Sequence, residues 1–216
     1  MTPTHHPGEA WLLDYALGHL SELHEAVLRA HVSVCSACRE RIAFAERLGG
    51  EFLRALPAEP MHFTAADVCD HHEQAIGGNA ILSRAHTPAS GDIEEVVATW
   101  LDSSLEALPW RRLGRGLALC RLGETDDARM WLLRGAPGTV LPTHTHAGSE
   151  LTLVLKGAYF CGNTIYGAGD LEDADESTEH QPVITRDGEC ICLAVTEGRL
   201  RFRDWAPRLL QPFVGI

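Results

Sequence analysis

Two sets of metal-ligand residues, placed in different halves of the chain, constrain its fold more than any other sequence feature. The first set combines histidines with a CxxC pair near the start of the chain: His5, His6, His31, Cys35 and Cys38. The second set contains only histidines and a glutamate: His144, His146, Glu150 and His180. Thiolate-rich sets are typical of closed structural zinc sites, whereas histidine and carboxylate sets suit open sites that can contact a ligand or an oxidant. The pattern therefore predicts two modules, one with a structural metal and one whose metal takes part in chemistry.

The composition indicates a folded protein that does not bind nucleic acid or a membrane directly. The chain has 216 residues, of which 45% are hydrophobic and 22% charged, as in ordinary folded proteins. The formal net charge of −12 disfavours contact with nucleic acid but not with a basic, DNA-binding protein. We see no signal-peptide pattern and no apolar run long enough to cross a membrane. Seven cysteines, including a CxxC beside a histidine, favour metal or redox chemistry in a reducing compartment, so we expect a cytoplasmic protein.

The first 80 or so residues have helical periodicity. Apolar residues three and four apart predict helices at about 8–17, 21–31, 36–48 and 64–77. Ser21 is the expected N-cap of the second helix. Gly18 is expected to end the first helix, and Gly49-Gly50 the third.

The periodicity changes after the small, polar stretch 83–92, which contains Pro and Gly and is typical of a linker. Short strands are expected at 130–133, 151–155, 180–185 and 190–196. Arg186-Asp187-Gly188 is a hairpin signal between the last two strands. We therefore predict an α+β multidomain chain with a small helical zinc-binding bundle, a linker and an antiparallel β-barrel with a tail, at 1–85, 86–94 and 95–216.

The first ligand set is predicted to bind zinc. If a helix runs through His31, Cys35 lies one turn later on the same face, and Cys38 follows across a tight turn. Zinc prefers a tetrahedral set of nitrogen and sulfur ligands, and such a site would add folding energy to a thin helical core. The alternative is a redox-active CxxC pair beside a surface histidine.

The fourth ligand of this site has three candidates. His6 leads, because packing of the first helix would bring the N-terminus near the other ligands. His5 and His24 compete with it, although we expect His24 to be solvated. Another possible cluster consists of Cys69, His71 and His72. We expect an ordinary buried cysteine and exposed histidines there rather than a metal site.

The segment that holds His5-His6 and His31-x3-Cys35-x2-Cys38 resembles the zinc-binding anti-sigma domain of bacterial anti-sigma factors. In that family, the N-terminal helices clamp a sigma factor of the extracytoplasmic-function (ECF) type and keep it off core RNA polymerase. The resemblance therefore implies an ECF-type sigma factor as the partner of this chain.

A second resemblance lies in the other half of the chain. Gly138-x5-His144-x-His146-x3-Glu150-x6-Gly157 matches the first motif of the cupin family without a gap. Two histidines two residues apart on a strand point to one face, and the glutamate that opens the next strand can reach the same ion. The resemblance implies that the predicted β-barrel is of the cupin type.

The second cupin motif is retained only in part. Gly169 and His180 hold their places, whereas Asp175, Ser177 and Ile184 stand where the motif has Pro, Gly and Asn. The turn before the histidine is acidic and expected to differ in conformation: Glu172, Asp173, Asp175, Glu176 and Glu179. This departure from the motif weakens the inference that the chain has the activity of cupin dioxygenases. The fourth ligand, His180, is still present. The ligand set suits zinc, iron, manganese, nickel or copper.

Cys190 and Cys192 lie two apart on a predicted strand, so both sulfurs should share one face. Their Cα atoms would lie about 6.6 Å apart, which would strain a disulfide between them. They are interpreted as two buried hydrophobic side chains, with a thiol sensor as the alternative.

Together, the two halves resemble the ChrR family of anti-sigma factors, which implies zinc in the cupin site as well. The resemblance implies a non-enzymatic, cytoplasmic anti-sigma factor. It would release its sigma factor when the cupin domain responds to singlet oxygen or organic peroxide. One alternative is a metal-dependent cupin enzyme, such as a dioxygenase, with a zinc-stabilised helical oligomerisation module. Another is a cupin small-molecule sensor with an unrelated helical partner.

Overall fold

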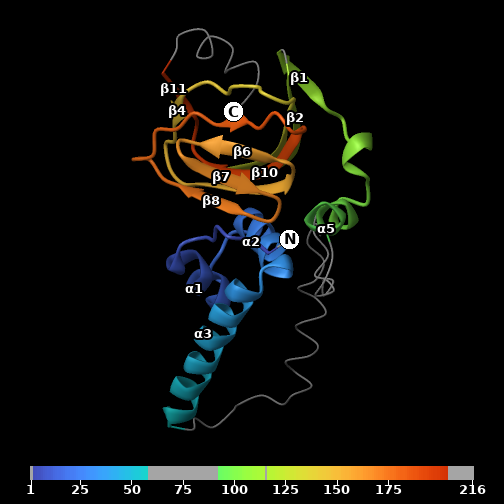
Figure 1. Cartoon of the computed structure of the whole chain (residues 1–216). Coiled ribbons are helices and arrows are strands. Elements are labelled where there is room, and N and C mark those ends of the chain that lie inside the picture. Colours follow the sequence, from blue (N-terminus) through green and yellow to red (C-terminus); the bar gives the residue numbers. More distant parts are fainter. Residues whose placement is uncertain (1, 58–91, 115, 204–216) are drawn as a thin grey trace.

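The computed structural model describes residues 2–57, 92–114 and 116–203. Its helices lie at one end of a β-structure, and the third helix extends away from it (Figure 1). The helices are α1 (Glu9–Leu17), α2 (Glu22–Val34), α3 (Ser36–Ala55) and α5 (Ile93–Trp100), with a 3-10 turn at Leu105–Ala107. The expected fourth helix, the Cys69 cluster, most of the expected linker and the C-terminal tail lie outside the described residues.

Two helix boundaries agree with the sequence and one does not. Helix α1 ends at Gly18, whose φ of +69° is the left-handed conformation that glycine adopts without strain. Helix α2 begins after Ser21, as expected. The prediction that Gly49-Gly50 ends the third helix is wrong, because α3 runs through both glycines. A glycine inside a helix costs only about 1 kcal/mol, so the helix continues until Leu56, which takes an extended conformation before Pro57.

The strands form three antiparallel sheets. The largest has the order β1 (Arg111–Gly114), β2 (Leu117–Glu124), β3 (Ala128–Gly135), β10 (Cys190–Glu197), β5 (Glu150–Lys156) and β8 (Leu171–Ala174). A second sheet has the order β7 (Thr164–Gly167), β6 (Ala158–Cys161) and β9 (Val183–Ile184), and a third pairs β11 (Arg201–Phe202) with β4 (His144–Thr145). The expected α+β class is confirmed, and among the described strands the cupin-type barrel is open rather than closed.

The predicted hairpin at Arg186-Asp187-Gly188 is wrong. Strand β9 pairs with β6, whereas β10 pairs with β3 and β5, so these residues carry the chain from one sheet to another. Ile184 of β9 and Cys190 of β10 are buried in one apolar cluster with Tyr159 of β6 and Val154 of β5, so this cluster contains residues of both sheets.

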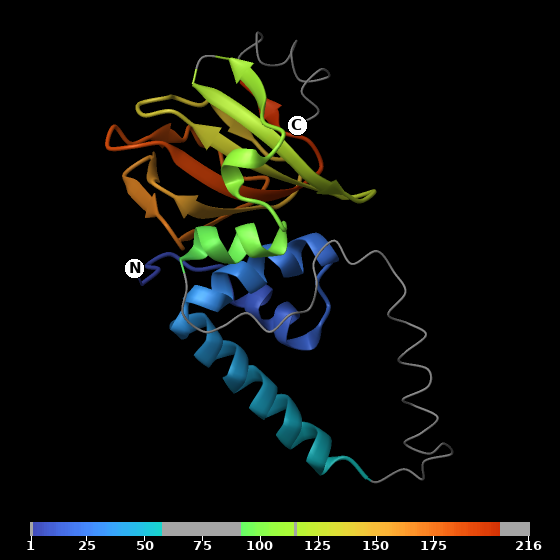
Figure 2. The same ribbon diagram turned by 90° about the vertical axis from the view of Figure 1, so that its right-hand side faces the viewer.

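An apolar core joins α2 and α5 to the largest sheet, while buried residues of α1 and α3 form a separate cluster. Helices α2 and α5 lie side by side under the sheet (Figure 2). Val27 and Leu28 of α2 are completely buried in one cluster with Leu153 of β5 and Leu193 of β10. Helices α2 and α5 therefore pack as a layer on the β-structure. Among the described residues, no helix is long and apolar enough to cross a membrane.

Candidate metal centres

Four side chains of the first ligand set converge in the structure. Ligand atoms of His6, His31, Cys35 and Cys38 all lie within 4.8 Å of one another. His31 Nε2 lies 3.3 Å from Cys38 Sγ, and His6 Nδ1 lies 3.3 Å from Cys35 Sγ and 3.5 Å from Cys38 Sγ. We call this group the N-terminal centre.

The junction of α2 and α3 brings three of these residues together. His31 lies in the last turn of α2, and Cys35 is both the C-cap of α2 and the N-cap of α3. The extended backbone of Cys35 turns the chain, and its sulfur accepts a hydrogen bond from the amide of Cys38. The tight turn expected from the spacing is therefore present.

The donors of the N-terminal centre fit a divalent cation. His31 is completely buried, and burial lowers its pKa to about 4, so its ring is neutral at physiological pH. Its Nδ1–H donates to the carbonyl oxygen of Gly169 over 2.8 Å, which leaves Nε2 free to face the sulfurs. Burial and the neighbouring Cys35 raise the pKa of the Cys38 thiol to about 12, a penalty that a bound cation would relieve.

The two competing histidines lie elsewhere. His5 points toward Asp170, with its Nδ1 3.3 Å from Oδ2 of that carboxylate. His24 was expected to be solvated, but it is buried with only 3% of its surface exposed. It stacks on Trp11 and lies beside Glu197 of β10, because the β-structure packs over α2.

The second ligand set also converges. Ligand atoms of His144, His146, Glu150 and His180 lie within 4.8 Å of one another, and all four residues are buried. His180 Nε2 lies 3.0 Å from His144 Nε2 and 3.1 Å from His146 Nε2. Three lone-pair nitrogens so close together require a shared cation or proton. We call this group the cupin centre.

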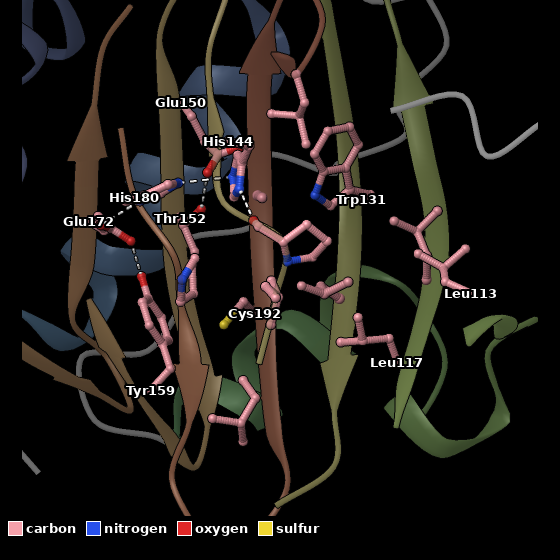
Figure 3. A pocket seen from close by; sticks show the side chains of 18 of the residues that line it. Leu113, Leu117, Trp131, His144, Glu150, Thr152, Tyr159, Glu172, His180 and Cys192 are labelled. Carbon is pink, nitrogen blue, oxygen red and sulfur yellow. Dashed lines mark hydrogen bonds and ion pairs between the residues drawn. The ribbon is translucent and has the colours of Figure 1, made fainter. Parts of the chain in front are cut away.

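Hydrogen bonds to the outer nitrogens orient two of these rings (Figure 3). His144 Nδ1–H donates to the carbonyl oxygen of Pro142 over 2.8 Å, and His180 Nδ1–H donates to Glu172 over 3.1 Å. Both bonds leave the Nε2 atoms directed at the cluster. Glu172 also accepts a bond from the hydroxyl of Tyr159. Sequence reasoning assigned Glu172 to an acidic turn, but it lies on β8 and points into the β-structure.

Electrostatics favour a cation at the cupin centre. Burial raises the pKa of Glu150, against the lowering effect of nearby His144. Burial lowers the pKa of His146 to about 4, and its Nδ1 is buried without a hydrogen-bond partner. Burial alone would raise the pKa of Glu172, but its hydrogen bond to His180 reverses the effect and lowers it. Burial would lower the pKa of His180, but its hydrogen bond to Glu172 reverses the effect and raises it. A cation would compensate the buried carboxylate, use the rings of His144 and His146 as ligands and compete with a proton for His180.

A cavity of about 310 Å³ opens beside the cupin centre (Figure 3). His144, Glu150 and His180 form part of its wall. The remaining wall is mostly apolar and includes Leu113, Leu117, Leu119, Trp131, Leu133, Leu141, Ile184, Leu200 and Phe202. Sequence patterns did not reveal this cavity, because its walls come from distant strands.

Cys192 also lines the cavity, and Cys190 lies two residues before it on β10. Both cysteines are buried free thiols with their sulfurs 3.6 Å apart, so they share one face as expected. The hydrogen bond between them and their burial raise the pKa of Cys192 well above its ordinary value. The sulfur is therefore a thiol, which is a poor nucleophile.

Comparisons with known proteins agree with this architecture. Residues 103–200 match the family described as the ChrR Cupin-like domain. The Anti-sigma-E factor ChrR of Cereibacter sphaeroides is 37% identical over 217 residues, with all of both chains covered. The crystal structure of Rhodobacter sphaeroides SigE in complex with the anti-sigma ChrR contains a chain that matches at 34% identity with a TM-score of 0.71. That match covers 91% of this chain and 99% of the other. This chain therefore belongs to the ChrR family of anti-sigma factors.

Proposed function

We propose that this chain is a cytoplasmic anti-sigma factor that sequesters an ECF-type sigma factor through its helices. Release of the sigma factor would follow a response of the cupin part to an oxidative signal. The full-length relative is named an anti-sigma-E factor, and the matching solved chain is in complex with SigE. The observation that carries the proposal to particular residues is an exposed apolar stripe on α3.

This stripe consists of Phe44, Leu48 and Phe52, which are spaced four apart and lie on one side of α3. Phe44 is 63% exposed and Phe52 is 66% exposed. Large apolar side chains that gather on a surface mark protein interaction sites. Helix α3 extends away from the β-structure, so the stripe is accessible to a partner (Figure 1).

The charge of the chain complements the proposed partner. The net charge is −12, and a protein that binds DNA carries basic surfaces. Opposite potentials accelerate association and suppress contacts with wrong partners. Occupation of a basic sigma-factor surface would also keep that surface from its own targets.

We propose zinc at the N-terminal centre, with His6, His31, Cys35 and Cys38 as ligands. Nitrogen and sulfur ligands around a buried site are typical of structural zinc. The ion would stabilise the junction of α2 and α3 and thereby hold α3 in its orientation. This support would keep the exposed stripe in a fixed position for its partner.

At the cupin centre we propose zinc or another divalent transition metal, with His144, His146, Glu150 and His180 as ligands. A bound metal would supply Lewis acidity at the wall of the apolar cavity. The chain's own residues orient the ligand rings, and the apolar wall admits a small uncharged molecule. An oxidative signal that alters a ligand or a neighbouring thiol would then shift the balance between bound and released sigma factor.

The experiment is a binding titration of the purified full chain against a purified ECF-type sigma factor. Phe52→Ser should weaken binding by about 30-fold, since an aromatic side chain that anchors an interface contributes about 2 kcal/mol or more. Ile165→Ser is the matched control, because Ile165 is also an exposed apolar residue but lies on β7. Equal affinity of wild type and Phe52→Ser would contradict the assigned surface, and absence of binding by the wild type would contradict the function.

A further inference from the structure

Strand β8 contacts a ligand of the cupin centre, and β8 together with the turn before it contacts the N-terminal centre through His31 and the neighbours of His6. Successive side chains of a strand point to opposite faces. Glu172 therefore points into the β-structure, while Leu171 and Asp173 face the helical part. Figure 1 shows β8 at the edge of the β-structure that is nearest to α1 and α2.

The inner face of β8 positions a ligand of the cupin centre. Glu172 accepts the Nδ1–H of His180 over 3.1 Å and is itself held by the hydroxyl of Tyr159. The bond fixes the ring of His180 with Nε2 toward the other ligands. Glu172 is thus a positioning residue for His180.

The first residue of β8 and the residue before it hold the N-terminal segment in place. Asp170, which is buried, accepts hydrogen bonds from the amides of Thr4 and His5 over 2.6 and 2.9 Å. The amide of Leu171 in turn donates to the carbonyl oxygen of His5 over 3.2 Å. The backbone immediately before His6 is therefore bonded to the β-structure.

The outer face of β8 holds the backbone after His6. Asp173 accepts a hydrogen bond from the amide of Gly8 over 3.0 Å and another from the indole of Trp11 over 3.1 Å. His6 is therefore flanked on both sides by residues bonded to β8. Its approach to the sulfurs of the N-terminal centre depends on this strand.

The turn before β8 positions a second ligand of the N-terminal centre. The carbonyl oxygen of Gly169 accepts the Nδ1–H of His31 over 2.8 Å. Gly169 has a φ of +89°, and a Cβ atom there would lie 3.0 Å from Pro3. Both features require glycine, so the turn brings its carbonyl and the N-terminal segment together.

We infer that β8 couples the two metal centres, so that occupation of one strengthens metal binding at the other. The inference rests on the metal centres of the proposed function. A metal at the cupin centre fixes the position of the His180 ring. The hydrogen bond between His180 and Glu172 then restricts the motion of β8. The strand then holds His6 and His31 in place for the N-terminal centre. Such coupling is reciprocal, because each metal must raise the affinity of the other by the same factor.

The test uses the full chain, stripped of metal and titrated with Co²⁺ against a competing chelator. All forms carry Cys161→Ser, because the Cys161 sulfur lies 3.6 Å from His180 Nδ1 and could bind cobalt beside the cupin centre. In this background, thiolate-to-cobalt charge-transfer absorption reports the N-terminal centre, because the four cupin ligands contain no thiolate. Glu150→Ala, which disables the cupin centre, should weaken cobalt binding at the N-terminal centre by about tenfold. Glu172→Gln keeps the volume of the side chain but removes its charge, and it should produce part of the same loss.

Asp170→Asn should weaken the N-terminal centre by about tenfold while the cupin centre keeps its metal. In the Asp170→Asn/Glu150→Ala double variant the two losses should not add, because both act through β8. Glu179→Gln is the matched control, since Glu179 is beside His180 in sequence but its side chain is exposed toward Arg203. This control should leave both affinities unchanged.

Equal cobalt affinity at the N-terminal centre in wild type, Glu150→Ala and Glu172→Gln would overturn the inference. Absence of the charge-transfer band in the wild type would overturn it together with the N-terminal centre. Circular dichroism checks that each variant is folded. If Asp170→Asn does not fold, the comparison of Glu172→Gln with the wild type is sufficient for the test. A chain that shows the coupling but binds no sigma factor contradicts the proposed function alone.

Discussion

Leu28→Ala tests whether the helical and β parts unfold as one unit. Leu28 is completely buried in the core cluster that joins α2 to β5 and β10. A leucine-to-alanine change at such a site costs about 3 kcal/mol, through lost burial and the cavity left behind. For a chain of this size, each kcal/mol lowers Tm by about 2–4 °C, so the expected decrease is about 6–12 °C.

The assay follows thermal unfolding by helix circular dichroism and by hydrogen exchange of the β-sheet amides. Both probes should shift together, because the mutated side chain contributes to the packing of both parts. Leu17→Ala is the control, since Leu17 is 55% exposed and its truncation should change stability by less than about 0.5 kcal/mol. Two separate transitions, of which only the helical one moves, would refute the shared core.

Three further predictions concern the centres. Cys38→Ala should abolish the charge-transfer band of bound cobalt, reduce helix content and weaken sigma-factor binding, because the binding energy of a structural metal is largely folding energy. A Cys38→Ala variant with full helix content and full affinity for the sigma factor would disprove a structural role of the metal. Glu150→Ala should retain the sigma factor without oxidant but release less of it with oxidant, as measured by co-purification, and unchanged release would remove the metal from sensing. Burial lowers the pKa of His31 and of His146 to about 4, below the ordinary 6.5, so the unfolded chain binds more protons between these values. The metal-free chain should therefore lose stability as pH falls from about 6.5 to 4 in urea titrations, and a flat profile would contradict the burial of these rings.

Local sequence patterns predicted the parts of the molecule that depend on near neighbours. The helix through His31, the turn at Cys35 and the glycine that ends α1 follow from spacing and backbone preference, and the structure has all three. His144 and Glu150 reach one cluster because the cupin motif places them at adjacent strand starts. These features require only a few residues of separation, so the sequence alone determines them.

The sequence was a weaker guide where distant contacts decide the outcome. It ranked His6 above His5 and His24 only through the expected packing of the first helix, and its expectation that His24 is solvated was wrong. Hydrogen bonds to β8, more than 150 residues further along the chain, direct His5 toward Asp170. Packing of the β-structure on α2 buries His24 away from the sulfurs.

Only the tertiary structure revealed how the two halves are joined. The acidic residues before His180 were predicted to form a turn. In the structure two of them lie on β8, where Glu172 points toward that histidine and Asp173 toward the helices. The alternation of side chains along a strand is a local property. Packing between sheets and helices decides which neighbours each face of the strand contacts. The sequence thus predicted which residues form the two clusters. The hydrogen bonds that orient these residues form only when segments far apart in the chain pack into one core.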